Sequence, residues 1–276
     1  MRATSADLHD RVVLVTGASS GIGAAIARHL ATIGYRVFGT TRATTPGSGS
    51  SVEMLTLDVD DDMSVQRGIE SVLRAAGRLD VVINNAGCEL AGAIEDTSIE
   101  EARAQMETNF FGVLRVCRAA LPIMRQQGLG HIVNISSLAG LVGIPFSGLY
   151  SASKFAVEGL SEALRLEVHR HGIHVVLIEP GDFQSALAAR RRTVQAAAAN
   201  PAYRAAFAAF KVVQARNEAR APTPEPIARL VAGILAEAAP RARYSIGMPD
   251  QRIVAPLKRF VPSRLLERII RVALGV

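Results

Sequence analysis

The sequence predicts an α/β fold in which helices cover both faces of a doubly wound parallel sheet of about seven strands. Short runs of apolar, β-branched residues alternate with longer stretches of helical periodicity, which is typical of repeated βα units. A glycine-rich turn at residues 16–23 joins the first of these runs to the first helical stretch. The 276 residues are 49% hydrophobic and 20% charged, so we expect one globular domain over residues 1–276.

Seven segments have the length and composition of buried parallel strands. The first, RVVLVT, is almost wholly apolar, and the sixth is ended by Pro180 and Gly181. Parallel neighbours need a long connection, so a helix is expected between strands. The expected strands are residues 11–16, 36–41, 52–57, 80–83, 131–135, 173–178 and 243–246.

The helical stretches lie between these strands. Gly34 is expected to end the first helix as its C-cap, and Pro122 to kink the last turns of the third. A loop rich in glycine, serine, threonine and proline follows the second strand at residues 43–51. The expected helices are residues 24–33, 63–76, 98–126, 150–169 and 227–238.

The pattern changes over residues 182–222, which are rich in alanine and arginine. Pro201 breaks this stretch, so we expect helical pieces that lie outside the sheet and act as a substrate lid. Arg190, Arg191 and Arg192 are consecutive within it. Consecutive residues point in different directions on a helix, so this run is interpreted as a solvated face.

Residues 250–276 are expected to form a C-terminal extension with an amphipathic helix. After Pro262, Ser263 is the expected N-cap. One helix face is apolar and the opposite face is basic. The apolar face comprises Leu265, Leu266, Ile269, Ile270 and Ala273. The basic face comprises Arg264, Arg268 and Arg271. We favour docking of this helix on the protein's own core or on a second subunit; peripheral contact with an anionic membrane is the alternative.

The basic character of the chain does not predict nucleic-acid binding. The formal charge is +6 and the pI is near 9.9. Residues 258–276 contribute much of the excess, with five basic residues against one acidic residue. Because the chain has no tryptophan and few other aromatic residues to stack on bases, we do not expect nucleic acid as a partner.

Membrane, disulfide and metal signals are weak. No stretch approaches the roughly 18 apolar residues of a membrane span, and residues 1–10 lack the apolar core of a secretory signal, so a cytoplasmic protein is expected. Cys88 and Cys117 lie far apart, which favours reduced, buried thiols, although Cys88 could line a pocket. The six histidines lack metal-ligand spacing, so no metal is expected.

The turn at residues 16–23, TGASSGIG, has the chemistry of a phosphate-binding loop. Glycine lets the backbone turn tightly and approach a pyrophosphate. The helix that follows directs free N–H groups and the positive end of its dipole at the phosphates. The spacing is TGxxxGxG rather than the common GxGxxG, and its position between a strand and a helix supports the interpretation.

Further motifs follow this turn in order. NNAG at residues 84–87 follows the fourth strand, Ser137 follows the fifth, and Tyr150 with Lys154 forms a YxxxK pattern. Pro180-Gly181 follows the sixth strand. With Asn109 in the long helix, these motifs resemble the classical short-chain dehydrogenase/reductase family over about residues 10–250.

The resemblance implies a Rossmann-type fold, a nicotinamide cofactor and four catalytic residues: Asn109, Ser137, Tyr150 and Lys154. In the family the asparagine anchors a water that links the lysine to solvent. Ser185 stands where the family's PGxxxT motif has threonine; since the hydroxyl is kept, we expect contact with the carboxamide end of the cofactor to survive.

The proposed catalytic residues also make chemical sense. Tyr150 and Lys154 are four residues apart, so they are neighbours on one helix face. A tyrosine with a pKa near 10 is a poor base at neutral pH, but a close ammonium favours the phenolate and lowers that pKa. Ser137 can fold back from a strand end to orient the substrate oxygen while Tyr150 moves the proton. Ser136 is the rival serine, and the family register favours Ser137.

The same resemblance predicts the cofactor contacts. Asp58 is expected to accept from the adenine amino group, with Val59 against the ring, although Asp58 could instead cap the helix that opens near Met63. The expected cofactor-binding residues are Gly17, Ser19, Ser20, Gly21, Ile22, Gly23, Thr41, Arg42, Asp58, Val59, Asn85, Ala86, Gly87, Tyr150, Lys154, Pro180, Gly181, Phe183 and Ser185.

Two residues at the end of the second strand predict the choice of cofactor. NAD-selective relatives carry an acidic residue there, which repels a 2′-phosphate. Here the position is Thr41, and the guanidinium of Arg42 follows and can pair with that phosphate. We therefore expect NADP(H) to be preferred, with NAD(H) possible, unless Arg42 is only a solvated loop residue.

These features predict an oxidoreductase that acts on a secondary alcohol or ketone, or on an aldehyde. Residues 37–42 and 149–154 look most like the branch with 17β-hydroxysteroid and retinol dehydrogenases, which indicates an apolar, medium-sized substrate. Epimerisation or dehydration on the same scaffold, and a cofactor-binding sensor, are the alternatives. The family pairs long helices across subunits, so residues 98–126 and 150–169 are the expected surfaces of a homodimer or homotetramer.

Overall fold

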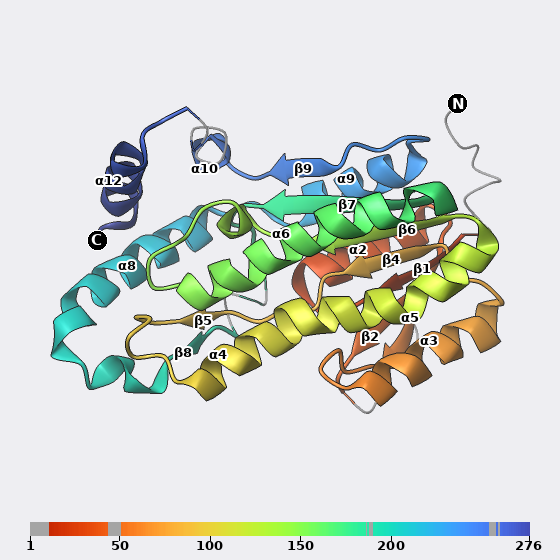
Figure 1. Cartoon of the computed structure of the whole chain (residues 1–276), viewed down its shortest axis with the longest axis horizontal. Coiled ribbons are helices and arrows are strands. Elements are labelled where there is room, and N and C mark those ends of the chain that lie inside the picture. The colour runs from red at the N-terminus through yellow and green to blue at the C-terminus, as the bar shows by residue number, and fades with distance from the viewer. Residues whose placement is uncertain (1–10, 44–50, 186, 188–189, 254–257, 259) are drawn as a thin grey trace.

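The computed structural model describes residues 11–43, 51–185, 187, 190–253, 258 and 260–276. Its centre is a seven-stranded sheet in the order β3-β2-β1-β4-β6-β7-β9, with every neighbouring pair parallel (Figure 1). The strand order reverses at β1, as in a doubly wound sheet, so the predicted fold class is confirmed. The strands are β1 (Val12–Val15), β2 (Arg36–Thr41), β3 (Glu53–Thr56), β4 (Val81–Asn84), β6 (Gly130–Ile135), β7 (Ile173–Pro180) and β9 (Arg243–Ile246).

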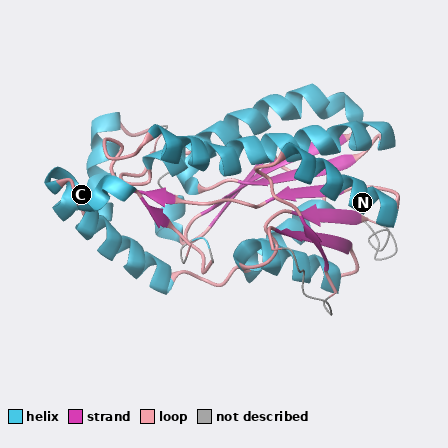
Figure 2. Ribbon diagram, turned by 90° about the horizontal axis from the view of Figure 1, so that it is seen from below, coloured by secondary structure: helices cyan, strands magenta, loops and turns pink. Residues whose placement is uncertain are grey.

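Helices cover both faces of the sheet (Figure 2). One apolar core lies between the sheet and helices α2 (Gly21–Thr32) and α9 (Glu225–Ala236). A second core lies on the opposite face, against α3 (Asp62–Ala76), α5 (Gly112–Gln127) and α6 (Gly148–Val168). Because both faces are buried, the central strands are continuously apolar rather than alternating, which is why they were recognisable in the sequence.

The first helix begins earlier than the sequence predicts. Its first residue is Gly21 and its N-cap is Ser20, in extended conformation. Two glycines of the phosphate-binding motif therefore belong to the helix itself. At the other end the helix stops at Thr32 and the C-cap is Ile33, not Gly34. Gly34 is the next residue, with a φ of +105°, as is common for a glycine directly after a C-cap.

The long helix expected over residues 98–126 is interrupted. It consists of α4 (Ile99–Met106), a π-helical turn η1 (Glu107–Phe111) and α5, which continues through Pro122 to Gln127. A π turn carries an extra residue, so it shifts the side chains that point inward. This turn holds Asn109, whose side chain is buried.

A second, two-stranded parallel sheet was missed. It pairs β5 (Leu90–Ala91) with β8 (Arg192–Thr193), and strands this short leave no periodic pattern in the sequence. The next helix, α8 (Pro201–Arg220), begins at Pro201. Pro201 was predicted to break a helix. It instead begins α8, because proline is favoured in the first helical turn. Figure 1 shows that α8 lies outside the main sheet, as expected.

The C-terminal helix α12 (Ser263–Leu274) packs beside α8 (Figure 1). Leu266 is buried, and Leu274 joins an apolar cluster with Phe207 and Phe210 of α8. The helix contacts α8, while Leu265 and Ile269 of its predicted apolar face remain exposed. The N-cap is Pro262, not Ser263, which is the first helical residue and makes no capping hydrogen bond. None of the described helices is long and apolar enough to cross a membrane.

A half-buried histidine, whose ring Nε2 is shielded from solvent, makes the stability of this fold depend on pH. The ring of His131 on β6 lies 5.0 Å from that of His174 on β7, and its Nε2 has no hydrogen-bond partner among the described residues. Burial, and to a lesser extent His174 and Arg11, lowers the pKa of His131 to about 4. In the unfolded chain this histidine binds its proton near pH 6.5. The folded state therefore loses stability as the pH falls from about 6.5 to about 4.

We expect this loss to reach about 2 to 3 kcal/mol near pH 4, since each pKa unit corresponds to about 1.4 kcal/mol. Urea unfolding at pH 7 and pH 4.5 measures it, with His131→Gln as the comparison. The variant cannot titrate at this position, so its stability should change less between the two pH values. Equal changes in both proteins would contradict the prediction.

Candidate active site

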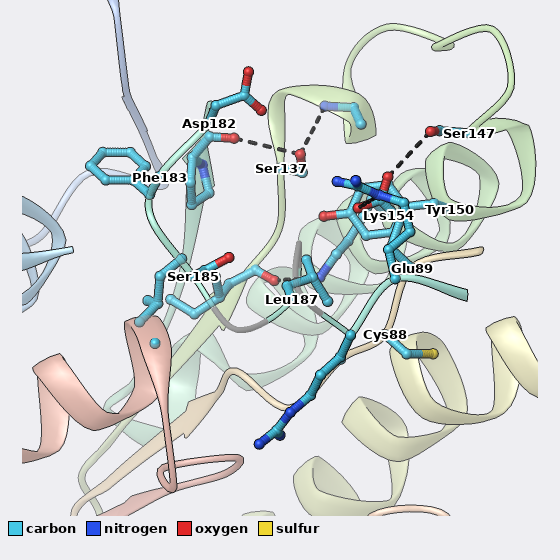
Figure 3. Close-up of a pocket in the computed structure, with 18 of the residues that line it drawn as sticks. Cys88, Glu89, Ser137, Ser147, Tyr150, Lys154, Asp182, Phe183, Ser185 and Leu187 are labelled. Atoms are coloured by element: carbon cyan, nitrogen blue, oxygen red, sulfur yellow. Dashed lines mark hydrogen bonds and ion pairs between the residues drawn. The ribbon is translucent and has the colours of Figure 1, made fainter. Parts of the chain in front are cut away.

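A cavity of about 1180 Å³ lies at the carboxyl ends of the parallel strands. The register aligns these ends, because Val15 pairs with Ile83 and Ile135 with Ile178. Residues that follow β1, β4, β6 and β7 therefore meet at one edge of the sheet, as Figure 3 shows for part of the cavity. Of the residues predicted from the sequence, all line this cavity except Gly23 and Asn109.

The glycine-rich turn is shaped for close approach by a ligand. Gly17 has a φ of +66°, and a Cβ there would lie 2.9 Å from the Cα of Ala86. A Cβ on Gly23 would lie 2.5 Å from the carbonyl oxygen of Gly17, so this glycine packs the helix against the turn rather than touching a ligand. Ser20 makes no side-chain capping bond, and the first turn of α2 has no acidic residue. The helix N-terminus is thus suited to a phosphate.

The NNAG segment fixes the shape of this turn. The side-chain amide of Asn85 donates to the carbonyl oxygens of Thr16 at 2.9 Å and Gly17 at 3.1 Å. In return, the hydroxyl of Thr16 accepts from the backbone N–H groups of Asn85 and Ala86 at 2.9 and 3.0 Å. This structural role of Thr16 was not predicted, although its position directly before the first glycine of the turn could have indicated it. Asn85 therefore has a structural role in addition to lining the cavity.

Asn109 is held in place by the buried backbone beside the cavity. Its side-chain oxygen accepts from the N–H of Cys88 at 2.9 Å, and its amide donates to the carbonyl oxygen of Cys88 and to the hydroxyl of Ser153, both at 3.0 Å. The π turn aims this side chain at the segment after NNAG. Cys88 is half-buried and lines the cavity, so the buried thiol expected there is found only at Cys117.

Tyr150, Ser137 and Lys154 lie together in the cavity wall (Figure 3). Ser137 follows β6; its hydroxyl donates to the carbonyl oxygen of Pro180 at 3.5 Å and accepts from the backbone N–H of Ala139 at 3.1 Å. Its rival Ser136 instead lies next to Glu158. The ammonium of Lys154 donates to the carbonyl oxygen of Ile135 at 2.9 Å. Both serines line the cavity.

The electrostatics of this group differ from the sequence-based expectation. Burial, reinforced by the carboxylate of Glu89, raises the pKa of Tyr150, whereas the nearby hydroxyl of Ser137 opposes the rise. Burial also lowers the pKa of Lys154 to about 8. The expected lowering of the Tyr150 pKa by Lys154 is therefore wrong for this structure. The Lys154 ammonium is bonded to the backbone and lies 5.8 Å from the centre of the phenol ring, so desolvation dominates.

Thr41, Arg42 and Asp58, which were predicted to bind the adenosine part of the cofactor, all line the cavity. The hydroxyl of Thr41 accepts from the backbone N–H of Ala43 at 3.2 Å, and the side chain of Arg42 is exposed. Asp58 does not cap the helix: its carboxylate accepts from the N–H of Asp60 at 3.1 Å, and the N-cap of α3 is Asp61. The capping alternative for Asp58 is therefore wrong.

A buried ion-pair network in the wall of the cavity was missed. Arg191, expected on a solvated face, pairs through Nε with Glu89 at 2.9 Å and through Nη2 with Glu218 at 2.5 Å. These residues are more than 25 positions apart along the chain, so no local spacing could reveal them. The neighbouring Arg190 and Arg192 are exposed, as expected.

Comparison with known proteins agrees with this geometry. The family model described as short chain dehydrogenase matches residues 11–196. The chain is 39% identical to a 3-ketodihydrosphingosine reductase of Bacteroides thetaiotaomicron, over 96% of this chain and 98% of the relative. It is 32% identical to retinol dehydrogenase 8 of Bos taurus, over 92% of this chain and 86% of the relative.

Solved structures share both the fold and the cofactor class. A short-chain dehydrogenase from Streptomyces avermitilis superposes with a TM-score of 0.79 at 34% identity, covering 96% of this chain and 99% of that chain. A reductase from Burkholderia phymatum in complex with NAD has a TM-score of 0.76 at 26% identity, covering 92% and 94%. A metagenomic oxidoreductase in complex with NADP has a TM-score of 0.69 at 29% identity, covering 88% and 98%. With its motifs assembled around one cavity, the chain belongs to the short-chain dehydrogenase/reductase family of NAD(P)-dependent oxidoreductases.

Proposed function

We propose that this protein is an NADP(H)-preferring oxidoreductase that interconverts an apolar, medium-sized ketone or aldehyde and its alcohol. The observation that carries the proposal is that Ser137, Tyr150 and Lys154 lie together in one wall of the cavity. A phenol kept protonated by burial, next to a second hydroxyl, can hold a carbonyl oxygen and give it a proton.

Each residue has a distinct role in this proposal. Tyr150 donates the proton to the substrate oxygen in reduction, and Ser137 orients that oxygen by a hydrogen bond. Lys154, whose ammonium lies at the carbonyl oxygen of Ile135, borders the nicotinamide ribose and supplies positive charge near the phenol. Asn109 keeps the segment at Cys88 fixed beside the site. A bound nicotinamide supplies or accepts the hydride.

The residues of the cavity fit a dinucleotide. The uncapped N-terminus of α2 and the turn at Gly17 are suited to the pyrophosphate, and Arg42 would pair with a 2′-phosphate. Asp58 and Val59 would border the adenine, and the backbone of Asn85 and Gly87 the nicotinamide end. The remaining contacts with the carboxamide end are assigned to Ala86, Pro180, Gly181, Phe183 and Ser185.

An apolar substrate suits the remaining part of the cavity. Its walls include aliphatic and aromatic side chains from three parts of the chain: the loop between β6 and α6 (Val142, Ile144), α8 (Phe210) and α12 (Ile270, Leu274). The insertion at residues 182–222 and α12 both contribute to this part, so we assign them as the substrate lid. Relatives named for the reduction of 3-ketodihydrosphingosine and the oxidation of retinol support a lipophilic substrate.

We also propose that the protein works in the cytoplasm as a homodimer or homotetramer. Large apolar side chains are exposed on the two helical surfaces named above, including Phe111 next to α5 and Phe155 and Leu166 on α6. Burial of such side chains across subunits would remove apolar area from water. Sedimentation velocity of the purified chain gives the mass of the assembly.

The proposed activity is tested by the change in absorbance at 340 nm. Aliphatic ketones, aldehydes, steroids and retinoids are offered with NADPH and with NADH. We expect turnover of at least one apolar carbonyl compound, faster at low cofactor concentration with NADPH. Tight NADPH binding without turnover of any compound, in either direction, would favour a sensor and overturn the proposal.

Arg42→Ala tests the choice of cofactor. Arg42 lines the cavity, and loss of one charge-assisted contact of its guanidinium with the 2′-phosphate costs about 1.5 to 3 kcal/mol. We expect NADPH binding, measured by fluorescence titration, to weaken by about 10- to 100-fold, while NADH binding changes little. Equal wild-type affinities for the two cofactors, or equal weakening of both in the variant, would refute the preference.

A further inference from the structure

Glu89 is a buried carboxylate at the substrate end of the cavity that the proposed mechanism does not use. Its side chain is 9% exposed, yet it lines the same cavity as Tyr150. Figure 3 shows the two side chains next to each other. The position is fixed by the backbone, because Glu89 directly precedes β5 and its carbonyl oxygen accepts from the N–H of Arg192 at 3.0 Å.

The two oxygens of this carboxylate are bonded unequally. Oε2 forms an ion pair with Nε of Arg191 at 2.9 Å, without the geometry of a hydrogen bond. Oε1 accepts only long contacts in the structure as described, from the hydroxyl of Ser147 and the side-chain amide of Gln214, both at 3.3 Å. Hydrogen bonds to a carboxylate are normally 2.5–2.9 Å long, so Oε1 remains able to accept a stronger bond.

The charges of the network do not balance. One guanidinium, that of Arg191, serves two carboxylates, those of Glu89 and Glu218. One negative charge therefore remains at a poorly solvated place, which is unfavourable unless a cation compensates it. The arginines at positions 190, 192, 216 and 220 also line the cavity but are exposed, so water screens their charge far more than that of Glu89.

Ser147 bonds to the carboxylate of Glu89 and lies close in the chain to the proposed proton donor, Tyr150. It is the residue immediately before α6, whose first turn contains Tyr150. A substrate whose carbonyl oxygen lies at Tyr150 would therefore bring its next one or two carbons close to Oε1 of Glu89. A positively charged amino group on one of these carbons would meet an acceptor that is otherwise poorly bonded.

We propose that Glu89, with Ser147 and Gln214, forms a binding site for a primary ammonium group, and that the substrate is an apolar ketone with an amino group one or two carbons from the carbonyl. This inference rests on the proposed reductase function and narrows its substrate class. It also fits the relative that is named a 3-ketodihydrosphingosine reductase, because that name describes an amino ketone with an alkyl chain.

The experiment compares two ketones that differ only in the amine, 2-aminododecan-3-one and dodecan-3-one, at saturating NADPH. A hydrogen bond to a charged group contributes about 1.5 to 3 kcal/mol, so the wild-type kcat/KM should be about 10- to 100-fold higher for the amino ketone. The preference should lie mainly in KM, because the ammonium contact exists before and during the reaction. In Glu89→Gln, which keeps the side-chain volume, the ratio should fall to about threefold or less.

Glu218→Gln is the matched control. It also removes a carboxylate partner of Arg191, so it reports any effect of loosening the network while Glu89 stays in place. Without this carboxylate Arg191 balances the charge of Glu89, so we expect the preference for the amino ketone to fall, but by less than in Glu89→Gln, because Oε1 of Glu89 can still accept from the ammonium. Loss of the preference to the same extent in both variants would overturn the assignment to Glu89.

Two outcomes separate the inference from the function on which it depends. If the wild-type protein reduces both ketones with equal kcat/KM, the ammonium site is wrong and the reductase function stands. If it reduces neither ketone and no other carbonyl compound, both fail. The comparison within the wild-type protein decides even if a variant does not fold.

Discussion

Tyr150→Phe lowers turnover by about 10²- to 10⁴-fold while NADPH binding persists. The substitution keeps the ring and removes only the hydroxyl, and loss of an acid–base group typically costs this much. The phenol lies in a buried wall of the cavity, so water cannot readily replace it as the proton donor. The loss should appear in kcat with little change in the affinity for the cofactor.

Tyr203→Phe provides the matched control for this substitution. Tyr203 loses the same atom, but its hydroxyl bonds to Glu95 at 2.6 Å on an exposed surface, outside the cavity lining. Stopped-flow or steady-state absorbance at 340 nm gives the rates, and fluorescence titration gives the NADPH affinity. Near-normal turnover in Tyr150→Phe would remove this residue from the mechanism.

Arg243→Ala destabilises the folded protein by about 2 to 4 kcal/mol. Arg243 on β9 pairs with Glu158 of α6, with Glu179 of β7 at 2.7 Å and with Glu162 at 2.5 Å. Glu158 and Glu179 are both buried, so the variant leaves two carboxylates without this partner in a region of low dielectric. Breaking a buried ion pair costs about 3 to 5 kcal/mol, and partial exposure of Arg243 reduces the figure.

Urea or thermal unfolding measures this loss. Arg229→Ala on α9 removes the same side chain from an exposed surface position and should change the free energy of unfolding by less than about 0.5 kcal/mol. Because Glu158 also neighbours Ser136 and Lys154, the Arg243 variant should lose activity in parallel with stability. An Arg243 variant as stable as the Arg229 variant would show that the buried acids do not depend on this guanidinium.

Most of the main sheet could be predicted because its signal is local. Strands such as β4 and β7 are buried on both faces, which requires unbroken apolar runs that are visible in the sequence. The glycines of the phosphate-binding turn were also predictable, since the conformation at Gly17 and the close packing at Gly23 exclude larger residues. The interruption of the long helix by a π turn was not predictable, because one inserted residue barely changes a helical pattern.

The sequence by itself determined the order of the βα units and the identity of the residues at the strand ends, including Ser137, Tyr150 and Lys154. The tertiary structure decided how those residues are solvated and which charges face them. The high pKa of Tyr150 and the pairing of Glu89 with Arg191 depend on burial and on contacts between distant segments. Such properties arise from the distances between packed side chains in three dimensions, which residue spacing along the chain does not specify.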